Sequence, residues 1–275
     1  MKADRLRGGG RSHKIISYHL FRKCPFEYLH SFQHAMNFRI VTYNIHKCKG
    51  LDFRTSPARI VKVLREIDAD IIALQEVVSH ENREPEENQA RYIAENLGYE
   101  YRIGENRKHL GGVYGNVVLS RFPIVEHKNF DITISGREPR GCQHVDVKLS
   151  ADNLLHVYNI HLGTAFMERR RQVKRLLDEE ILNRHHAAPR IMLGDFNEWT
   201  SGLASKLLKA HFRSADLREH LARRRTYPGI FPFLHLDHIY YDHHLKIEKA
   251  FVHRSKLALV ASDHLPLVAD FRWQS

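Results

Sequence analysis

The sequence predicts an α/β protein: a single domain of mixed sheets with flanking helices. Three observations predict this fold class. Apolar runs of strand length alternate along the chain with amphipathic segments of helical period. The 275 residues are 43% hydrophobic and 27% charged, an ordinary globular composition from which a sizeable core can form. No internal repeat or linker interrupts residues 36–275, so one domain accounts for them.

Strands are predicted where short apolar or alternating runs are bounded by turn-forming residues. In chain order they are FRIVTYN at 38–44, DIIALQEV at 70–77, GNVVLSRFPI at 115–124, CQHVDVKL at 142–149, LLHVYNIHLG at 154–163, RIMLGDF at 190–196, LDHIYYD at 236–242, LKIEKAFV at 245–252 and PLVADFRW at 266–273. The turn SADN at 150–153 is expected to join the fourth and fifth of them as a hairpin.

Helices are predicted between these strands. The segment 56–67 starts with a serine cap and a first-turn proline, and its apolar residues recur at helical spacing. The segment 87–98 is closed by a glycine. The segment 168–182 is amphipathic with a charged outer face, and a further helix is expected near 201–209.

The positive charge of the chain is uneven. The net charge is +11, of which residues 1–35 carry +5, leaving +6 for residues 36–275. The first 35 residues show no clear period and lack the apolar stretch of a signal peptide. We expect them to be a basic, disordered tail or to lie upstream of a true start at Met36. The mildly basic remainder permits an anionic substrate without demanding nucleic acid.

Cysteine content and hydropathy bear on the compartment. The three cysteines, Cys24, Cys48 and Cys142, form neither a disulfide framework nor a zinc pattern. A reducing compartment fits them, so we expect a cytoplasmic protein. No apolar run is long enough to cross a membrane. Stable membrane insertion is therefore not expected, and we expect a monomer.

Polar side chains cluster where the predicted strands begin or end. They comprise four carboxylates, three histidines and three amides: Glu76, Asp195, Asp237, Asp263, His161, His238, His264, Asn44, Asn116 and Asn197. Unpaired charge is costly to bury, so converging carboxylates would need a cation at their centre. Hard oxygen ligands of this kind suit Mg²⁺ or Mn²⁺ rather than zinc.

Each of these residues alone has an ordinary structural explanation. A single carboxylate at a strand end is most often a cap or a turn former. His161 alone reads as a core histidine, and His156, His238, His243 and His244 are further structural histidines among the 21 in the chain. Function is therefore indicated by the ordered set rather than by any one member.

Seven segments of the chain carry a family resemblance. In order they are TYNIHKCKG, ALQEV, GNVVLSRFPI, NIHLG, GDFNEW, LDHIYY and SDHLPLVADF. They resemble the endonuclease/exonuclease/phosphatase superfamily, which includes pancreatic-type deoxyribonucleases, abasic-site endonucleases, bacterial sphingomyelinases and inositol-polyphosphate 5-phosphatases. The resemblance spans about residues 38–273, and GDFN followed by SDH is its most specific part. It implies a four-layer α/β/β/α sandwich of two mixed sheets with outer helices.

The resemblance also implies the metal ligands and the substrate contacts. Glu76 is the implied principal ligand of Mg²⁺ or Mn²⁺. Asn44 would orient Glu76 or a bound water, and Asp263 would lie near the metal. Arg140 lies near the phosphate-binding arginine of the family, with Arg137 as its rival. Asn116 is assigned to substrate binding with Arg140.

The implied catalytic residues are five. Asp195 would orient or deprotonate the attacking water, and Asn197 would hold a phosphate oxygen. His264 would stabilise the scissile phosphate, with Asp237 fixing its tautomer. His161 would contact the phosphate or assist the leaving group. Phosphoester hydrolysis needs these parts: an activated water, neutralised oxygens and help for the leaving oxygen.

The expected activity is therefore metal-dependent hydrolysis of a phosphoester, with a phosphodiesterase or nuclease as the leading interpretation. A phospholipid or sphingomyelin-type phosphodiesterase and a phosphomonoesterase are the alternatives. A non-catalytic module is disfavoured, because every core position holds a competent residue. His46 stands where abasic-site enzymes place an acidic residue, which argues against abasic repair. The segment 226–241 resembles small bacterial members of the family, and its aromatic residues are expected either to line the cleft or to pack on the sheet edge.

Overall fold

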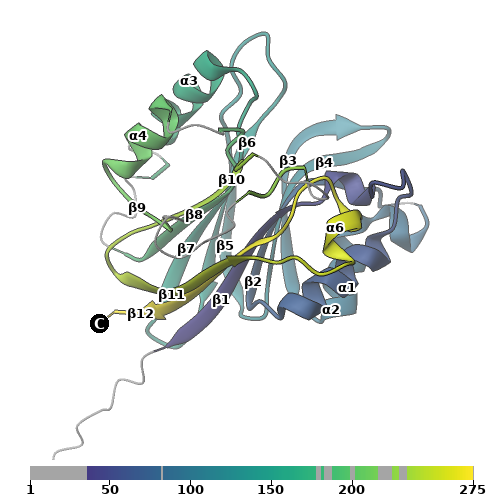
Figure 1. Ribbon diagram of the computed structural model, residues 1–275, viewed down its shortest axis with the longest axis horizontal. Coiled ribbons are helices and arrows are strands. Elements are labelled where there is room, and N and C mark those ends of the chain that lie inside the picture. The colour runs from purple at the N-terminus through teal and green to yellow at the C-terminus, as the bar shows by residue number, and fades with distance from the viewer. Residues whose placement is uncertain are drawn as a thin grey trace, which may run out of the picture. The chain divides into compact units, whose positions relative to one another are not determined.

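The computed structural model describes residues 36–81, 83–177, 181–182, 188–198, 202–215, 225–228 and 234–274. They belong to the unit Ala35–Ser275. The tail expected at 1–35 lies outside the described residues. Two six-stranded sheets pack face to face, and helices lie on their outer faces (Figure 1). The predicted sandwich of two mixed sheets with outer helices is confirmed.

The first sheet has the strand order β11-β12-β1-β2-β4-β3. Its strands are β1 (Asn37–Asn44), β2 (Ile71–Ser79), β3 (Glu100–His109), β4 (Gly112–Ser120), β11 (Leu245–Val252) and β12 (Leu267–Trp273). β1 and β2 run parallel, with Asn44 opposite Gln75, whereas the other neighbours are antiparallel. The parallel pair therefore brings Asn44 and the nearby Glu76 to the same edge of the sheet.

The second sheet has the strand order β5-β6-β7-β8-β10-β9. Its strands are β5 (Ile124–Asp131), β6 (Gly141–Lys148), β7 (Leu154–His161), β8 (Arg190–Asp195), β9 (Arg213–Ser214) and β10 (Asp237–Tyr241). β7 and β8 run parallel and end with His161 opposite Asp195, while β10 starts antiparallel with Asp237 opposite Asp195. Three predicted site residues thus lie side by side at one edge of this sheet.

Helices cover the outer faces of both sheets. α1 and α2 pack on the first sheet, and α3 and α4 pack on the second. The helices are α1 (Pro57–Ile67), α2 (Gln89–Leu97), α3 (Phe166–Leu176), α4 (Leu203–Lys209) and α6 (Ala258–Ala261), with short 3-10 turns η1 (His46–Cys48) and η2 (Pro85–Glu87). The predicted caps are present, since Ser56 accepts a hydrogen bond from the Arg59 amide at 3.3 Å and Gly98 ends α2 at φ 73°.

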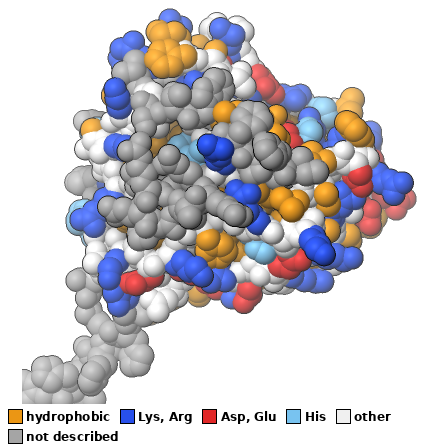
Figure 2. All heavy atoms as spheres, in the orientation of Figure 1, with side chains coloured by type: hydrophobic (Ala, Val, Ile, Leu, Met, Phe, Trp, Pro, Cys, Tyr) orange, Lys and Arg blue, Asp and Glu red, His pale blue; other side chains and the backbone are white. Residues whose placement is uncertain are grey.

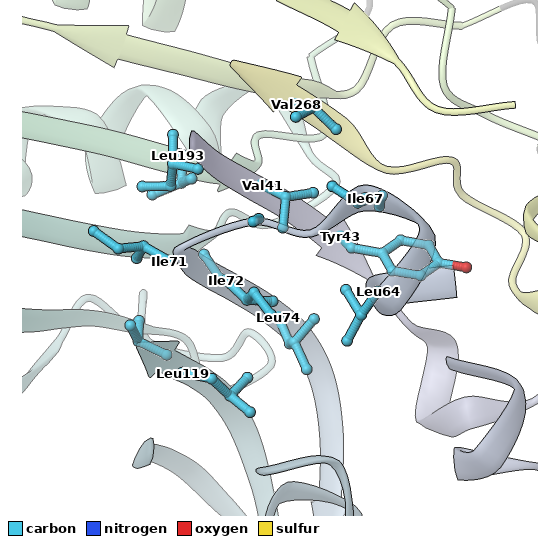
Figure 3. Packing of buried hydrophobic residues seen from close by; sticks show 14 of the residues in the cluster. Val41, Tyr43, Leu64, Ile67, Ile71, Ile72, Leu74, Leu119, Leu193 and Val268 are labelled. Atoms are coloured by element: carbon cyan, nitrogen blue, oxygen red, sulfur yellow. The ribbon is translucent and has the colours of Figure 1, made fainter. Parts of the chain in front are cut away.

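Strands β1 and β2 are apolar on both faces because both faces are buried. On the side facing α1, Val41 and Tyr43 pack near Leu64, as Figure 3 shows. On the side facing the second sheet, the strand residues meet β8 and β7. A strand covered on both sides reads as a continuous hydrophobic run, which is why the sequence predicts these two strands directly.

Three strands lie outside the sequence prediction, namely β3, β5 and the two-residue β9, and one helix has other bounds. β3 and β5 are edge strands whose residues are largely polar and partly exposed. They carry no apolar signal because only their backbone pairing with β4 and β6 defines them. α3 begins at Phe166 and ends at Leu176, whereas the pattern predicted 168–182. Of that predicted range, 178–180 lie outside the described residues.

A chain that begins at Met36 should keep the melting temperature of the full chain. Met36 packs on the main hydrophobic cluster, and its carbonyl accepts a hydrogen bond from the Trp273 amide at 2.9 Å. Met36 is therefore part of the folded unit. Residues 1–35 show no pattern of burial in the sequence, so their removal should cost no core contacts. Differential scanning calorimetry of both chains tests this. A melting temperature several degrees lower in the shorter chain would contradict it.

Candidate active site

The predicted site residues converge where the two sheets meet at their polar edges. Asn44, from the first sheet, donates a hydrogen bond from Nδ2 to Asp195 Oδ2, on the second sheet, at 3.1 Å. The same amide group donates to Glu76 Oε1 at 3.1 Å. Its own oxygen accepts from the His46 amide at 3.0 Å. Asn44 therefore positions two carboxylates from different sheets relative to each other.

Asp195 is the centre of this arrangement. Its Oδ2 atom lies 3.1 Å from Asn44 Nδ2 and 3.6 Å from the Nε2 atoms of both His161 and His264. Its Oδ1 atom accepts a hydrogen bond from the Asn197 amide at 2.8 Å. The side chain is buried, with 1% of its surface exposed. Four partners thus fix one carboxylate at the end of β8.

The backbone around Asp195 is shaped to present it. Gly194 has φ 147°, and a Cβ atom there would lie 1.8 Å from the Ile160 carbonyl oxygen of β7. Only glycine fits this close approach of two strands. Asn197 is held at φ 50°, and its Nδ2 atom donates to the Leu162 carbonyl at 2.9 Å. Left-handed backbone at a non-glycine residue is typical of functional sites.

His264 forms a dyad with Asp237. Its Nδ1 atom lies 3.0 Å from Asp237 Oδ2, and both side chains are buried. The Tyr227 ring lies against it, with centroids 4.9 Å apart. Burial lowers the pKa of His264, but the Asp237 and Asp195 carboxylates outweigh this effect and raise it to about 10. The ring is therefore a cation at neutral pH, with both nitrogens as donors.

His161 has the opposite charge state. Burial, together with the charges of Arg140 and His264, holds the pKa of His161 well below its ordinary value, so its ring is neutral. Its Nδ1 atom lies 3.4 Å from Arg140 Nη1. Arginine can only donate, so Nδ1 accepts and the proton sits on Nε2, the nitrogen that faces Asp195. Two histidines in different charge states therefore flank the same carboxylate.

Arg140, rather than its rival Arg137, contacts a predicted site residue, His161. Arg140 is 6% exposed, and its guanidinium also pairs with Glu138 at 3.0 Å. Arg137 is exposed, and its backbone amide bonds to the Ile134 carbonyl. Arg140 therefore lies against His161, and its phosphate-binding role stays a prediction.

Glu76 and Asp263 supply hard oxygens at the open side of the site. Glu76 is half-buried at φ 57°, where a bulge interrupts the pairing of β2 with β4. Asn44 donates a hydrogen bond to its Oε1 atom, and the Glu76 carboxylate is the predicted ligand of a cation. Asp263 Oδ1 accepts from Ser262 Oγ at 3.3 Å and lies 3.6 Å from His46 Nδ1.

The charges in the site fit a divalent cation. Burial raises the pKa of Tyr227, and so do the nearby carboxylates Asp263, Asp195 and Glu76. These carboxylates therefore lie close together, and Asp237 adds a fourth, whose buried Oδ1 atom has no hydrogen-bond partner among the described residues. His264 alone does not balance four carboxylates. Oxygen donors with excess negative charge are the ligands that Mg²⁺ and Mn²⁺ prefer.

Asn116 lies between the two sheets. It is fully buried, and its Nδ2 atom donates to the Gly141 and Asn159 carbonyls at 3.3 and 3.2 Å. Two buried amides that the sequence analysis passed over lie beside it. Asn159 and Gln75 bond to each other across the sheets at 2.8 Å. Asn116 thus joins the two sheets here, and its substrate-binding role stays a prediction.

Part of the aromatic segment predicted to line the cleft lies outside the residues that the structure describes. The residues described in the aromatic segment include Tyr227, which contacts His264, and Leu234, which is half-buried. Ile230, Phe231 and Phe233 lie outside the described residues. Within the described part of the chain, no helix combines the length and the apolar character needed to cross a membrane.

Fold and site together define a class: two-sheet sandwiches with a carboxylate, histidine and amide site at the strand ends. A model of the Endonuclease/Exonuclease/phosphatase family matches residues 41–264. The protein belongs to this family of phosphoester hydrolases, as its motifs predict.

Known proteins from several bacteria are similar to this chain. The protein YbhP of Escherichia coli K12 is 30% identical over 214 residues, which cover 74% of this chain and 84% of YbhP. A conserved protein of unknown function from Enterococcus faecalis V583 has 19% identity and a TM-score of 0.71, covering 86% of this chain and 100% of its own. A mannosyl-6-phosphatase of Bacteroides thetaiotaomicron has 19% identity and a TM-score of 0.67, covering 85% and 99%.

Proposed function

We propose that this protein is a Mg²⁺- or Mn²⁺-dependent phosphodiesterase in which Asp195 directs a water molecule onto the phosphorus atom. One observation carries the proposal: a single buried carboxylate is held at 3.1 Å by Asn44 and at 3.6 Å by two histidines in different charge states. That arrangement places a base, a cationic donor (His264) and a neutral donor (His161) around one point. Phosphoester hydrolysis requires both.

Asp195 is the proposed general base. Burial raises its pKa to about 6, with a further contribution from Asp237 that His264 opposes. At pH 7 the group is therefore mostly ionised and basic enough to take a proton from water. Asn44 and the Asn197 amide fix its orientation, so the lone pair points at a defined position.

The two histidines are proposed to act on the phosphate. Cationic His264 donates from Nε2 toward the non-bridging oxygens, while Asp237 holds its Nδ1–H at 3.0 Å. Neutral His161 offers Nε2–H to the phosphate or the leaving oxygen, because Arg140 fixes its tautomer. Asn197 holds another phosphate oxygen at the edge of the same turn.

Glu76 and Asp263 would hold the divalent ion, with Asn44 orienting Glu76 through the bond to Oε1. When bound, the ion supplies Lewis-acid charge that neutralises the phosphate oxygens. The residues of the chain then do the rest: they align the water, move its proton to Asp195 and bind the oxygens as charge develops.

A phosphodiester fits this site better than a phosphomonoester. The Arg140 guanidinium contacts His161, but the Glu138 carboxylate, 3.0 Å away, already neutralises its positive charge. A monoester carries an additional negative charge that needs dedicated cations. Because a mannosyl-6-phosphatase has a similar fold, phosphomonoesters are included among the test substrates.

Nucleic acid is the proposed substrate class, because its neighbouring phosphates can use a diffuse basic surface. Residues 36–275 carry a net +6. On the face in Figure 2, outside the grey atoms, Lys and Arg side chains are spread among acidic and polar ones rather than gathered in one patch. Contacts of that kind are sequence-independent and sensitive to salt.

With nucleic acid as substrate, KM should rise steeply between about 50 and 200 mM salt, because phosphate contacts depend on counterion release. Initial rates on single- and double-stranded DNA and RNA, measured with Mg²⁺ and Mn²⁺ at several salt concentrations, check this. The small phosphodiester bis(4-nitrophenyl) phosphate serves as the control. It carries one negative charge and no neighbouring phosphates, so its KM should respond little to salt.

Other substrates in the same panel separate the alternatives. Activity that appears only at phospholipid or sphingomyelin vesicles would support the lipid phosphodiesterase. Rapid release of inorganic phosphate from sugar or inositol phosphates, without cleavage of any diester, would refute the phosphodiesterase proposal.

A further inference from the structure

A second group of ligating side chains lies on the second sheet, away from the active site. His144 and Asp146 are on β6, and His156 is on β7 (Figure 1). The register places Asp146 opposite His156 and His144 opposite Tyr158. Residues two apart on a strand and their cross-strand partners share one face. Tyr158 belongs to the cluster under α3 and α4, so this is the outer face of the sheet.

The ligating atoms of the three residues converge on one point. Asp146 Oδ1 lies 2.9 Å from His144 Nε2 and 2.6 Å from His156 Nδ1. The two ring nitrogens are 3.4 Å apart. In a tetrahedral zinc site with bonds of about 2.0–2.1 Å, the ligand atoms lie roughly 3.3 Å from one another. The distance between the two ring nitrogens is close to this value, whereas the two distances from Asp146 Oδ1 to the rings are hydrogen-bond distances.

We propose that His144, Asp146 and His156 form a structural Zn²⁺ site that fastens β6 to β7. Two imidazoles and one carboxylate are ligands that zinc binds well, whereas Mg²⁺ and Ca²⁺ prefer oxygen. Bound zinc replaces the two contacts to Oδ1, and each neutral ring then carries its proton on its other nitrogen. The described residues supply three ligands, which leaves one tetrahedral position for a further donor.

Packing preorganises these ligands. His144 stacks on Tyr158 with centroids 4.6 Å apart and on His156 at 5.5 Å, with interplanar angles of 22° and 21°. The exposed fractions of His144, Asp146 and His156 are 2%, 4% and 3%. Rings fixed by stacking and shielded from solvent lose little entropy when they bind a metal. The site is therefore more than a chance meeting of surface side chains.

The zinc site is distinct from the catalytic one. His156 precedes His161 by five residues on β7, which places the two roughly 16 Å apart along the strand. The odd spacing also puts their side chains on opposite faces of the sheet. Loss of zinc should therefore lower stability and leave the catalytic metal in place.

Metal analysis tests the proposal directly. The test uses the Glu76→Gln variant, which lacks the main ligand proposed for the catalytic metal. After incubation with Zn²⁺ and gel filtration, this variant should retain about one zinc ion per chain. The same protein carrying His144→Gln and His156→Gln should retain almost none. His243→Gln with His244→Gln is the matched control. These two neighbouring rings have centroids 4.0 Å apart, follow β10 and are not among the three proposed ligands. Zinc should raise the melting temperature of the control but not that of the His144/His156 variant.

A measurement on the wild-type chain keeps the proposal testable if the double variant does not fold. X-ray absorption of the zinc-loaded protein should show two imidazole ligands, and the Co²⁺-substituted protein should show the visible absorption of a tetrahedral site. No retained zinc in the wild-type protein, or equal zinc in the control and the double variant, would overturn the proposal. Either result would mean that the three side chains form only a hydrogen-bonded triad.

Discussion

Asp195→Asn should lower kcat by at least ~10²-fold, the effect expected for loss of a general base. The amide keeps the shape of the carboxylate but cannot take a proton from water. Folding should persist, because an Asn side chain can still accept the bond from the Asn197 amide that Oδ1 now accepts at 2.8 Å. In the wild type, kcat should fall as the pH drops below about 6, since burial raises the pKa of Asp195 to about 6 and protonation removes the base.

The measurement is kcat at saturating substrate over a range of pH, with circular dichroism to confirm folding. His264→Ala should lower kcat by a similar factor, because it removes a cationic donor to the transition state. Asp152→Asn, on the exposed turn between β6 and β7, is the matched control and should leave kcat unchanged. A folded Asp195→Asn variant with nearly normal kcat would show that the base is another residue.

Glu76→Gln should weaken binding of the catalytic metal and abolish activity at low Mg²⁺ concentration. The substitution removes one negative charge from the site, while the new amide oxygen can still accept the bond that Asn44 makes to Oε1 at 3.1 Å. The change therefore acts on the metal more than on the fold. EDTA should abolish wild-type turnover, and Mg²⁺ added in excess of EDTA should restore it.

Titration of activity with Mg²⁺ gives the apparent metal affinity of each variant. Glu66→Gln is the control, because Glu66 pairs with His253 on the surface and takes no part in the site. Its apparent Mg²⁺ affinity should equal that of the wild type. Full activity of the wild type in EDTA would contradict the proposed metal dependence.

The sequence by itself determined the strands that are buried on both faces, the helix caps and the family. FRIVTYN and DIIALQEV predict β1 and β2 because covered strands must be apolar throughout. The caps of α1 and α2 are local interactions, so nearby residues suffice to predict them. The ordered motifs likewise named the candidate residues, because each motif is a short stretch at the end of one element.

Only the tertiary structure decided the pairings between segments distant in the chain. Edge strands β3 and β5 have no apolar pattern, since their partners alone define them. The choice of Arg140 over Arg137 depends on which side chain reaches His161. The pKa of His161 depends on burial and on the charges of Arg140 and His264. The pKa of His264 depends on burial and chiefly on Asp237 and Asp195, which lie far from it in the chain.

The histidines show the same division most clearly. In sequence, His156 is one of 21 and reads as a structural residue. In the fold, the register of β6 against β7 places it beside Asp146, with His144 two residues before Asp146 on the same strand. Ligand convergence is a property of three-dimensional distance, which cross-strand pairing sets and local sequence does not encode.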